Sequence, residues 1–232
     1  MSKHLFAVYN ERIPSKPTSL LIDNKTVVHR LSHVLRLKTG QTLTLFNEKI
    51  HAITKIISIE KDRIELDCIE IKPNKIIEPK AVVAVGFLKK DHFEQLVYNC
   101  TEIGATEIQP LITERSHRDI INEHELTRLK KIMVAACEQS KNFSMPVLKK
   151  PMELSQFLKQ NFEQKIFFSP SGENIQSIRS IESSLLIGPE PDFTEPEKLA
   201  IQESGYKEFK LTETVLRAVQ AATVGLGIFR SL

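Results

Sequence analysis

A continuous apolar run, Ala81–Leu88, constrains the fold more than any other feature of this sequence. A strand that is apolar at every position is typical of a sheet covered on both faces. A helical spacing of apolar residues follows from Phe93 to Ile103, and strand-like and helical segments then alternate towards the C-terminus. Strands that alternate with helices favour a largely parallel sheet, so residues 81–232 are predicted to form an α/β domain.

The later elements of this domain are predicted from the same patterns. Apolar spacing indicates a helix from Leu126 to Ser140 and a final helix that begins at Thr212 or Glu213 and continues through Leu226. Further strands are predicted at residues 107–112, 165–169, 184–187 and 208–211.

The residues before the apolar run have a different character. One helical segment, Thr26–Leu35, lies among β-rich segments at residues 4–9, 19–23, 41–46, 50–59 and 63–71. Many short strands with one helix indicate a small β-barrel. Proline and charge replace the apolar pattern over residues 73–80, which is typical of a linker. We therefore expect two domains, residues 1–72 and 81–232, joined by residues 73–80.

The composition argues against several protein classes. Hydrophobic residues make up 41% and charged residues 26% of the chain, as in ordinary globular proteins. No apolar run approaches the roughly 20 residues that span a bilayer, and the N-terminus has no secretory signal pattern. The three cysteines are odd in number and widely spaced, which indicates reduced, buried thiols in a cytoplasmic protein.

The positive charge is concentrated near the N-terminus. Residues 1–72 contain 12 Lys and Arg against 8 Asp and Glu, while the whole chain has a net charge of only +3. Such a basic part could attract a polyanion such as RNA. A surplus this small is also typical of an ordinary solvated surface.

Several common site motifs are absent from the sequence. It contains no Gly-x-Gly-x-x-Gly after a strand, no P-loop and no Gly-x-Ser-x-Gly elbow. His29 and His33 have the spacing of metal ligands on a helix, but no third ligand accompanies them. No metal is therefore expected.

The segment Leu185–Phe193 is the first candidate for a binding site. Its apolar strand ends abruptly at Gly188, Pro189 and Glu190. In an open α/β sheet, ligands bind just beyond the carboxyl ends of the strands. From these residues alone, a tight strand-to-helix turn without a ligand is an equally good interpretation.

Four segments of the sequence are each weak indicators of function, but their order and spacing together are highly specific for one protein family. They are His33–Gly40; Lys89–Glu94 leading to Thr101–Ala105; Thr113–Ser116 with Ala135–Ser140 and Pro146; and Ile187–Glu190 with Leu211–Arg217 and the final helix. Together they resemble the ribosomal RNA small subunit methyltransferase E family, a group of SPOUT-class methyltransferases. The resemblance extends over nearly the whole chain.

The resemblance implies a complete architecture and function. The fold would be α/β, with an N-terminal PUA-like β-barrel that binds RNA and a C-terminal SPOUT-type domain with a trefoil knot. The protein would be a cytoplasmic homodimer without a metal. It would use S-adenosylmethionine to methylate uridine N3 in the 16S rRNA of the small ribosomal subunit.

The resemblance also implies site residues. Three loops would hold the cofactor, mainly through their backbones, at Phe168, Ser169, Leu186, Ile187, Gly188, Pro189, Glu190, Leu211, Val215 and Leu216. Arg217 would bind or polarise the target base, although a salt bridge to Glu213 is an alternative role. Candidate RNA contacts are Arg36, Lys38, Arg115, Glu138 and Gln139, and Glu138 could instead be an exposed helix residue.

The sequence departs from the family pattern at several positions. Where the family usually has Gly-Gly after Gly-Pro-Glu, this chain has Pro191 and Asp192. Asn142 takes the place of an arginine, and His92 stands where lysine is common. Two alternatives therefore stay open: a weak or inactive RNA-binding relative that acts in ribosome assembly, and a methyltransferase with another RNA target.

Overall fold

The chain divides into two units, Met1–Ile76 and Ile77–Leu232, in the computed structural model. The structure describes residues 6–116, 118–175 and 178–232. Residues 4 and 5, with which the first predicted strand begins, therefore lie outside the described residues. The division between the units falls inside the segment that the sequence indicates as a linker. Each unit has its own hydrophobic core and is considered by itself.

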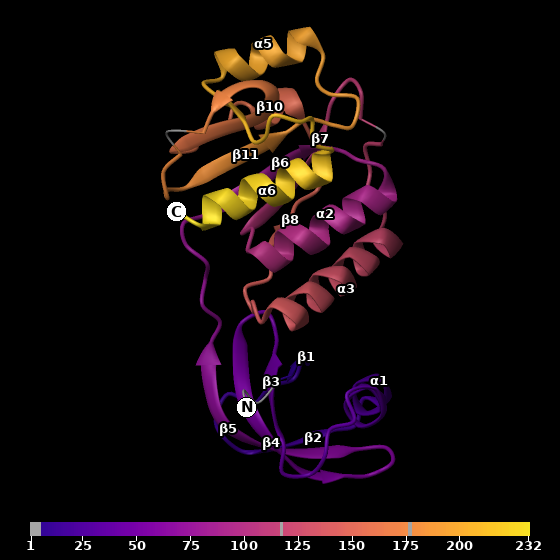
Figure 1. Cartoon of the computed structure of the whole chain (residues 1–232). Coiled ribbons are helices and arrows are strands. Elements are labelled where there is room, and N and C mark those ends of the chain that lie inside the picture. Colours follow the sequence, from indigo (N-terminus) through magenta and orange to yellow (C-terminus); the bar gives the residue numbers. More distant parts are fainter. Residues whose placement is uncertain (1–5, 117, 176–177) are drawn as a thin grey trace. The chain divides into compact units, whose positions relative to one another are not determined.

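The first unit is built on a five-stranded sheet with the order β1-β3-β4-β5-β2 (Figure 1). Strands β1 and β3 are parallel, and the other neighbours are antiparallel. Alternate side chains, such as Leu43, Leu45 and Leu66, are fully buried in its core. The strands are β1 (Phe6–Tyr9), β2 (Ser19–Ile22), β3 (Thr42–Phe46), β4 (Ile50–Ile59) and β5 (Ile64–Pro73). The PUA-like barrel stays a prediction.

The predicted helix of the first unit is present but changes its winding. Helix α1 (Lys25–His29) begins after Asn24, whose side chain accepts hydrogen bonds from the N–H groups of Thr26 and Val27. It continues as a π-helix, η1 (Arg30–Val34). The next residues leave the helix through Arg36, which has a positive φ of 50°, the left-handed conformation common just after a helix.

The second unit contains a seven-stranded sheet in which every pairing is parallel. The predicted parallel α/β arrangement is therefore confirmed. Its path is β12-β10-β11-β6-β7-β8, and β9 also pairs with β7. The strands are β6 (Ala81–Gly86), β7 (Glu107–Ile112), β8 (Val147–Leu148), β9 (Met152–Glu153), β10 (Gln164–Asn174), β11 (Ser183–Ile187) and β12 (Lys207–Lys210).

Helices cover both faces of this sheet, as the apolar run Ala81–Leu88 predicted. On one face, Val83 and Val85 pack with α2 (Lys90–Ile103), α3 (Glu123–Ser140) and α6 (Ala218–Arg230). On the other face, Val82 and Ala84 pack with α4 (Leu154–Phe157) and α5 (Glu195–Glu203). Figure 1 shows α5 on the opposite side of the sheet from α2, α3 and α6. The trefoil knot stays a prediction.

Two glycines mark close approaches near the strand ends. A Cβ atom at Gly86, the last residue of β6, would lie 2.5 Å from the ring of Pro189. A Cβ atom at Gly225, in α6, would lie 2.3 Å from the ring of Phe168. Because such distances are far below van der Waals contact, only glycine lets these segments pack so tightly.

The predicted start of the final helix is wrong. Helix α6 begins at Ala218, and residues 212–217 form a loop. The Thr212 hydroxyl donates to the Thr214 carbonyl at 2.6 Å, a local hydrogen bond that competes with helix formation. The proposed Glu213–Arg217 salt bridge is therefore also wrong: Glu213 pairs with Lys210 at 2.9 Å instead.

The cysteines Cys68, Cys100 and Cys137 are free and buried, as predicted. Burial raises the pKa of the Cys100 thiol to about 12, so it stays protonated at neutral pH. Within the described residues, no helix has the length and apolar character that crossing a bilayer requires.

Candidate active site

A pocket of about 430 Å³ lies beside the middle of β10, at the ends of β11 and β12 and at the start of α6. Three segments form most of its wall: residues 168–170, residues 187–192 and residues 211–221. Residues 187–192 and 211–221 begin at the carboxyl ends of β11 and β12, and residues 168–170 lie inside β10, where its pairing with β11 ends at Phe168. Ligands bind beyond such strand ends in open α/β sheets. The structure thus brings together three segments that lie within residues 168–221 of the sequence.

Most of the residues that the sequence assigned to a cofactor line this pocket. They are Phe168, Ser169, Ile187, Gly188, Pro189, Glu190, Leu211, Val215 and Leu216. Arg217, the predicted catalytic residue, lines it as well. Their roles towards a ligand stay proposals, but their common location is a finding.

Leu186 does not line the pocket. Its side chain is fully buried against Phe167 and Phe193 on the α5 side of the sheet. Successive side chains of a strand point to opposite faces, and here Leu186 packs on the α5 side of the sheet while Ile187 packs on the α6 side. The side chain of Leu186 is therefore a core residue.

The loop 188–193 is held by contacts on its outer side. The Asp192 N–H donates to the Pro189 carbonyl at 2.9 Å, which closes a turn. The Asp192 carboxylate pairs with Lys198 of α5 at 2.9 Å, and this hydrogen bond raises the pKa of Lys198. Arg115 donates to the Pro191 carbonyl at 3.1 Å. Arg115, which the sequence predicts to bind RNA, thus contacts the loop 188–193.

Asp192 occupies a backbone conformation that favours glycine. Its φ is +66°, in the left-handed region. Aspartate tolerates this region better than most residues, which accounts for its presence at this position. A Cβ atom at Gly188 would lie 2.9 Å from Asp192 Oδ1, so the two positions depend on each other.

Helix α2 adds a polar edge that the sequence did not assign to the site. His92 Nδ1 contacts Glu190 Oε1, and both residues line the pocket. The side chain of His92 is 42% exposed, which leaves its ring accessible to solvent. Gln95, one turn further along α2, also lines the pocket. His92 and Gln95 follow the predicted strand Ala81–Leu88 in the sequence. Because ligands bind beyond the carboxyl ends of parallel strands, the end of this strand was a signal that could have pointed to both residues.

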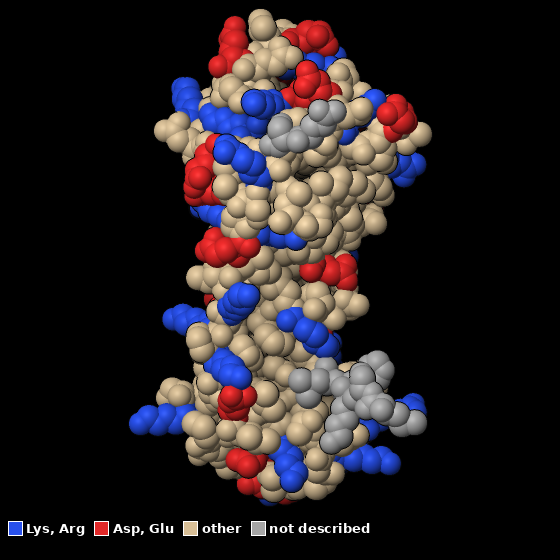
Figure 2. Space-filling model, turned by 60° about the vertical axis from the view of Figure 1, so that its left-hand side comes forward, with Lys and Arg blue, Asp and Glu red and all other residues tan. Residues whose placement is uncertain are grey.

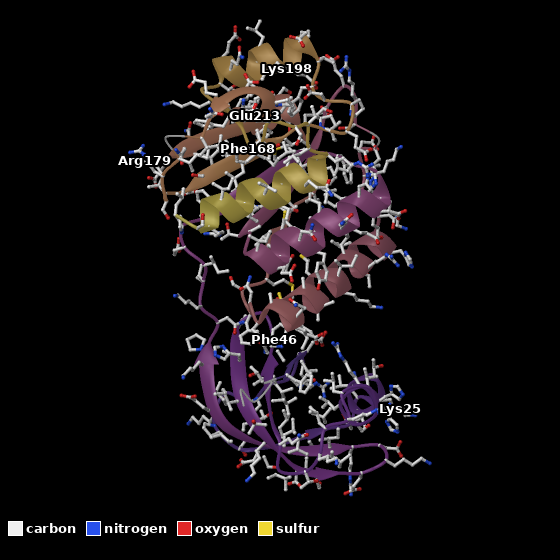
Figure 3. All side chains as sticks on the ribbon, in the orientation of Figure 1. Lys25, Phe46, Phe168, Arg179, Lys198 and Glu213 are labelled. Carbon is white, nitrogen blue, oxygen red and sulfur yellow. The ribbon has the colours of Figure 1, made fainter. Side chains whose placement is uncertain are left out.

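The inner wall of the pocket is apolar. Phe168, a residue of β10, is 5% exposed (Figure 3). Its ring lies against Gly225 of α6. Val215 is 79% exposed, although it is a branched apolar residue. A flat aromatic ligand could therefore be enclosed between a fixed ring on one side and the loop 211–217 on the other.

Comparison with known proteins places this pocket in a family. Residues 77–230 match the family model described as an RNA methyltransferase domain. The chain belongs to this RNA methyltransferase family. The matched region includes the whole sheet of the second unit and every described residue that lines the pocket.

Individual relatives agree with this assignment. The ribosomal RNA small subunit methyltransferase E of Rickettsia conorii is 29% identical over 88% of this chain and 86% of its own length. The enzyme of the same name from Synechocystis sp. is 26% identical over 88% of this chain and 71% of its own length. The resemblance inferred from the sequence to the small subunit methyltransferase E family is therefore confirmed.

Solved structures share the fold. The ribosomal RNA small subunit methyltransferase E of Neisseria gonorrhoeae, crystallised with bound S-adenosyl methionine, superimposes with a TM-score of 0.85. Its sequence is 22% identical, and the match covers 98% of both chains. The likeness thus extends to both units of this RNA methyltransferase.

The other candidate RNA contacts of this methyltransferase lie outside the pocket. Arg36 and Lys38 are exposed residues of the first unit, and Gln139 is exposed near the end of α3. Glu138 is only 5% exposed, so the alternative of an exposed helix residue is wrong. A buried carboxylate at this position cannot meet RNA without a rearrangement of α3.

Charged side chains of both signs are interspersed on the face that Figure 2 shows.

Within the described residues, no three His, Cys, Asp or Glu side chains are grouped so that they could hold a metal ion. His29 and His33 instead stack their rings at a centroid distance of 5.0 Å.

Proposed function

We propose that this protein uses S-adenosylmethionine to methylate uridine N3 in the 16S rRNA of the small ribosomal subunit. The single observation that carries the proposal is the pocket, which unites the three predicted loops and Arg217 at the carboxyl ends of parallel strands. Membership of the RNA methyltransferase family and the cofactor bound to the Neisseria gonorrhoeae relative support it.

The pocket suits S-adenosylmethionine chemically. Its volume of about 430 Å³ falls within the range of small-molecule sites. Phe168, Ile187 and Leu216 offer apolar walls for an adenine ring. Glu190 adds a carboxylate that complements the positive charge of a sulfonium or an ammonium group, whereas the Asp192 carboxylate is paired with Lys198.

The chemistry that remains for the protein is mainly alignment. S-adenosylmethionine supplies a methyl group already activated by its sulfonium. The loops hold the donor in place, so that orientation contributes several kcal/mol to catalysis. Arg217, exposed at the start of α6, is placed to stabilise the anion that forms when a uridine loses its N3 proton.

We further propose that the first unit is a PUA-like RNA-binding barrel and that the second contains a trefoil knot. The same proposal includes a homodimer in the cytoplasm. We assign RNA contacts to Arg36 and Lys38 in the first unit and to Arg115 and Gln139 in the second. The predicted contact Glu138 is not included, because its side chain is buried.

Calorimetry with S-adenosylmethionine tests the cofactor assignment. We expect one site per chain, and we expect Gly188→Val to abolish binding because a side chain there meets Asp192. Gly227→Val is the matched control for glycine substitution, since Gly227 has no atom within 4 Å of its Cβ position, has no positive φ and lies outside the pocket lining. If the protein is instead an inactive RNA-binding relative, the wild-type protein will not bind S-adenosylmethionine.

A further inference from the structure

His92 and Glu190 form a pair at the edge of the proposed active site whose geometry matches a catalytic base and its orienting carboxylate. Histidine Nδ1 contacts Glu190 Oε1. Because an ionised carboxylate can only accept a hydrogen bond, the ring is the donor in this contact and carries its proton on Nδ1. In a neutral imidazole the other nitrogen, Nε2, then carries the free lone pair. A carboxylate that fixes the tautomer in this way also stabilises the imidazolium that forms on protonation.

The reaction needs such a base. Methylation of a ring nitrogen that bears hydrogen, as in a uridine, requires that nitrogen to lose its proton. Arg217 can stabilise the resulting anion, but a guanidinium stays protonated and cannot accept a proton. Some other group in the pocket must do so, directly or through one water molecule.

The described residues of the pocket lining offer three groups that can accept a proton: His92, Glu190 and Asp192. Asp192 is held by Lys198 of α5, and Glu190 is held by His92. Histidine is also ordinarily a stronger base than a carboxylate and works close to neutral pH. His92, which is 42% exposed, is therefore the group best suited to the task.

We propose that His92 Nε2 is the general base of the methyl transfer and that Glu190 is its positioning residue. This inference rests on the proposed function. The N3–H bond of the target breaks, its proton goes to Nε2, and the electron pair stays on N3. That pair forms the bond to the methyl carbon while the carbon–sulfur bond breaks and leaves its pair on sulfur. The imidazolium then releases the proton to water.

The tautomer of His92 tests the pair without any turnover. Imidazole nitrogen NMR of the wild-type protein should show His92 with hydrogen on Nδ1 and none on Nε2. In Glu190→Gln the amide can donate to Nδ1, so we expect the Nε2–H tautomer to increase. A wild-type His92 that carries its hydrogen on Nε2 would overturn the proposal.

Kinetics test the base itself. In His92→Ala we expect kcat to fall about 100-fold or more with the affinity for S-adenosylmethionine unchanged, and added imidazole to restore part of the rate. His124→Ala is the matched control, because His124 is exposed on α3 and lies outside the pocket. It should behave as the wild type does.

The outcomes separate the two proposals. Wild-type protein that methylates RNA, together with an unchanged kcat in His92→Ala, would overturn only the assignment of the base. The same assignment would be overturned if His92→Ala lost activity that imidazole does not restore and also bound the cofactor more weakly. In that case His92 would only support the structure of the pocket. Wild-type protein without any methyl transfer would refute the proposed function, and the base with it.

Discussion

Arg217 is the residue on which the proposed chemistry depends most. It lies at the junction of the loop 211–217 and α6, with extended backbone angles and an exposed side chain. Within the described residues its side chain forms no ion pair or hydrogen bond, so it contributes little to folding. We therefore expect Arg217→Ala to lower methyl transfer at least 100-fold while the melting temperature stays unchanged.

The matched control for this substitution is Arg179→Ala. Arg179, labelled in Figure 3, is also exposed. It is not among the residues that line the pocket. Its removal should leave the rate of methyl transfer unaltered. Normal turnover by Arg217→Ala would remove Arg217 from the mechanism.

Asp192 offers a test of backbone conformation at the same scale. Its φ of +66° costs a residue with a side chain about 1 kcal/mol relative to glycine. The partly exposed ion pair with Lys198 adds at most about 1 kcal/mol to the free energy of unfolding. We expect Asp192→Gly to be at least as stable as the wild type, and Asp192→Ala to be less stable than Asp192→Gly by about 1 kcal/mol.

Urea denaturation of the two variants measures this difference, and neither variant retains the ion pair. The comparison therefore isolates the effect of φ. An alanine variant as stable as the glycine variant would show that this turn does not hold its left-handed conformation in solution.

At the scale of elements, the contact between α6 and β10 shapes the pocket. A methyl group at Gly225 would meet the Phe168 ring at 2.3 Å, so one of the two must move. We expect Gly225→Ala to destabilise the protein by about 1–3 kcal/mol and to weaken binding of S-adenosylmethionine. Urea denaturation and calorimetry measure the two effects.

Gly227 is the control on the same helix, because its Cβ position has no atom within 4 Å. Gly227→Ala should stabilise α6 by up to about 1 kcal/mol, since alanine is the better helix former. Equal effects of the two substitutions would mean that the close packing of α6 on Phe168 does not occur.

The elements themselves were largely predictable from hydrophobic periodicity. Long patterns such as Ala81–Leu88 and Phe93–Ile103 predict a buried strand and a helix that the structure contains. The helix start at Thr212 was mispredicted, because the apolar spacing of Val215 and Leu216 continues that of α6 while the threonines bond locally. Periodicity does not register such competing hydrogen bonds.

The site was predictable in part for a similar reason. The resemblance named the loops, but it could not tell that Leu186 faces away from the pocket, which depends on the register of β11. It also could not bring His92 to Glu190, because that contact joins residues 98 positions apart. Such pairings exist only in the assembled sheet.

At the scale of the whole molecule, the division at residues 76 and 77 separates the pocket from the first unit. Every described residue that lines the pocket lies in Ile77–Leu232, which also has its own buried core. A fragment of residues 77–232 should therefore fold and bind S-adenosylmethionine as the full chain does, while it loses affinity for RNA.

Calorimetry and an RNA-binding titration on the fragment and the full chain measure both properties. A folded fragment that retains the full affinity for RNA would contradict an RNA-binding role for the first unit.

The central claim concerns the reaction, and nucleoside mass spectrometry tests it most directly. Purified protein would be incubated with labelled S-adenosylmethionine and with small ribosomal subunits that lack the modification. Arg217→Ala serves as the inactive control, and an active small subunit methyltransferase E serves as the positive one. We predict labelled 3-methyluridine in the 16S rRNA treated with the wild-type protein and none with Arg217→Ala. No labelled 3-methyluridine from the wild type, under conditions where the positive control works, would contradict the account.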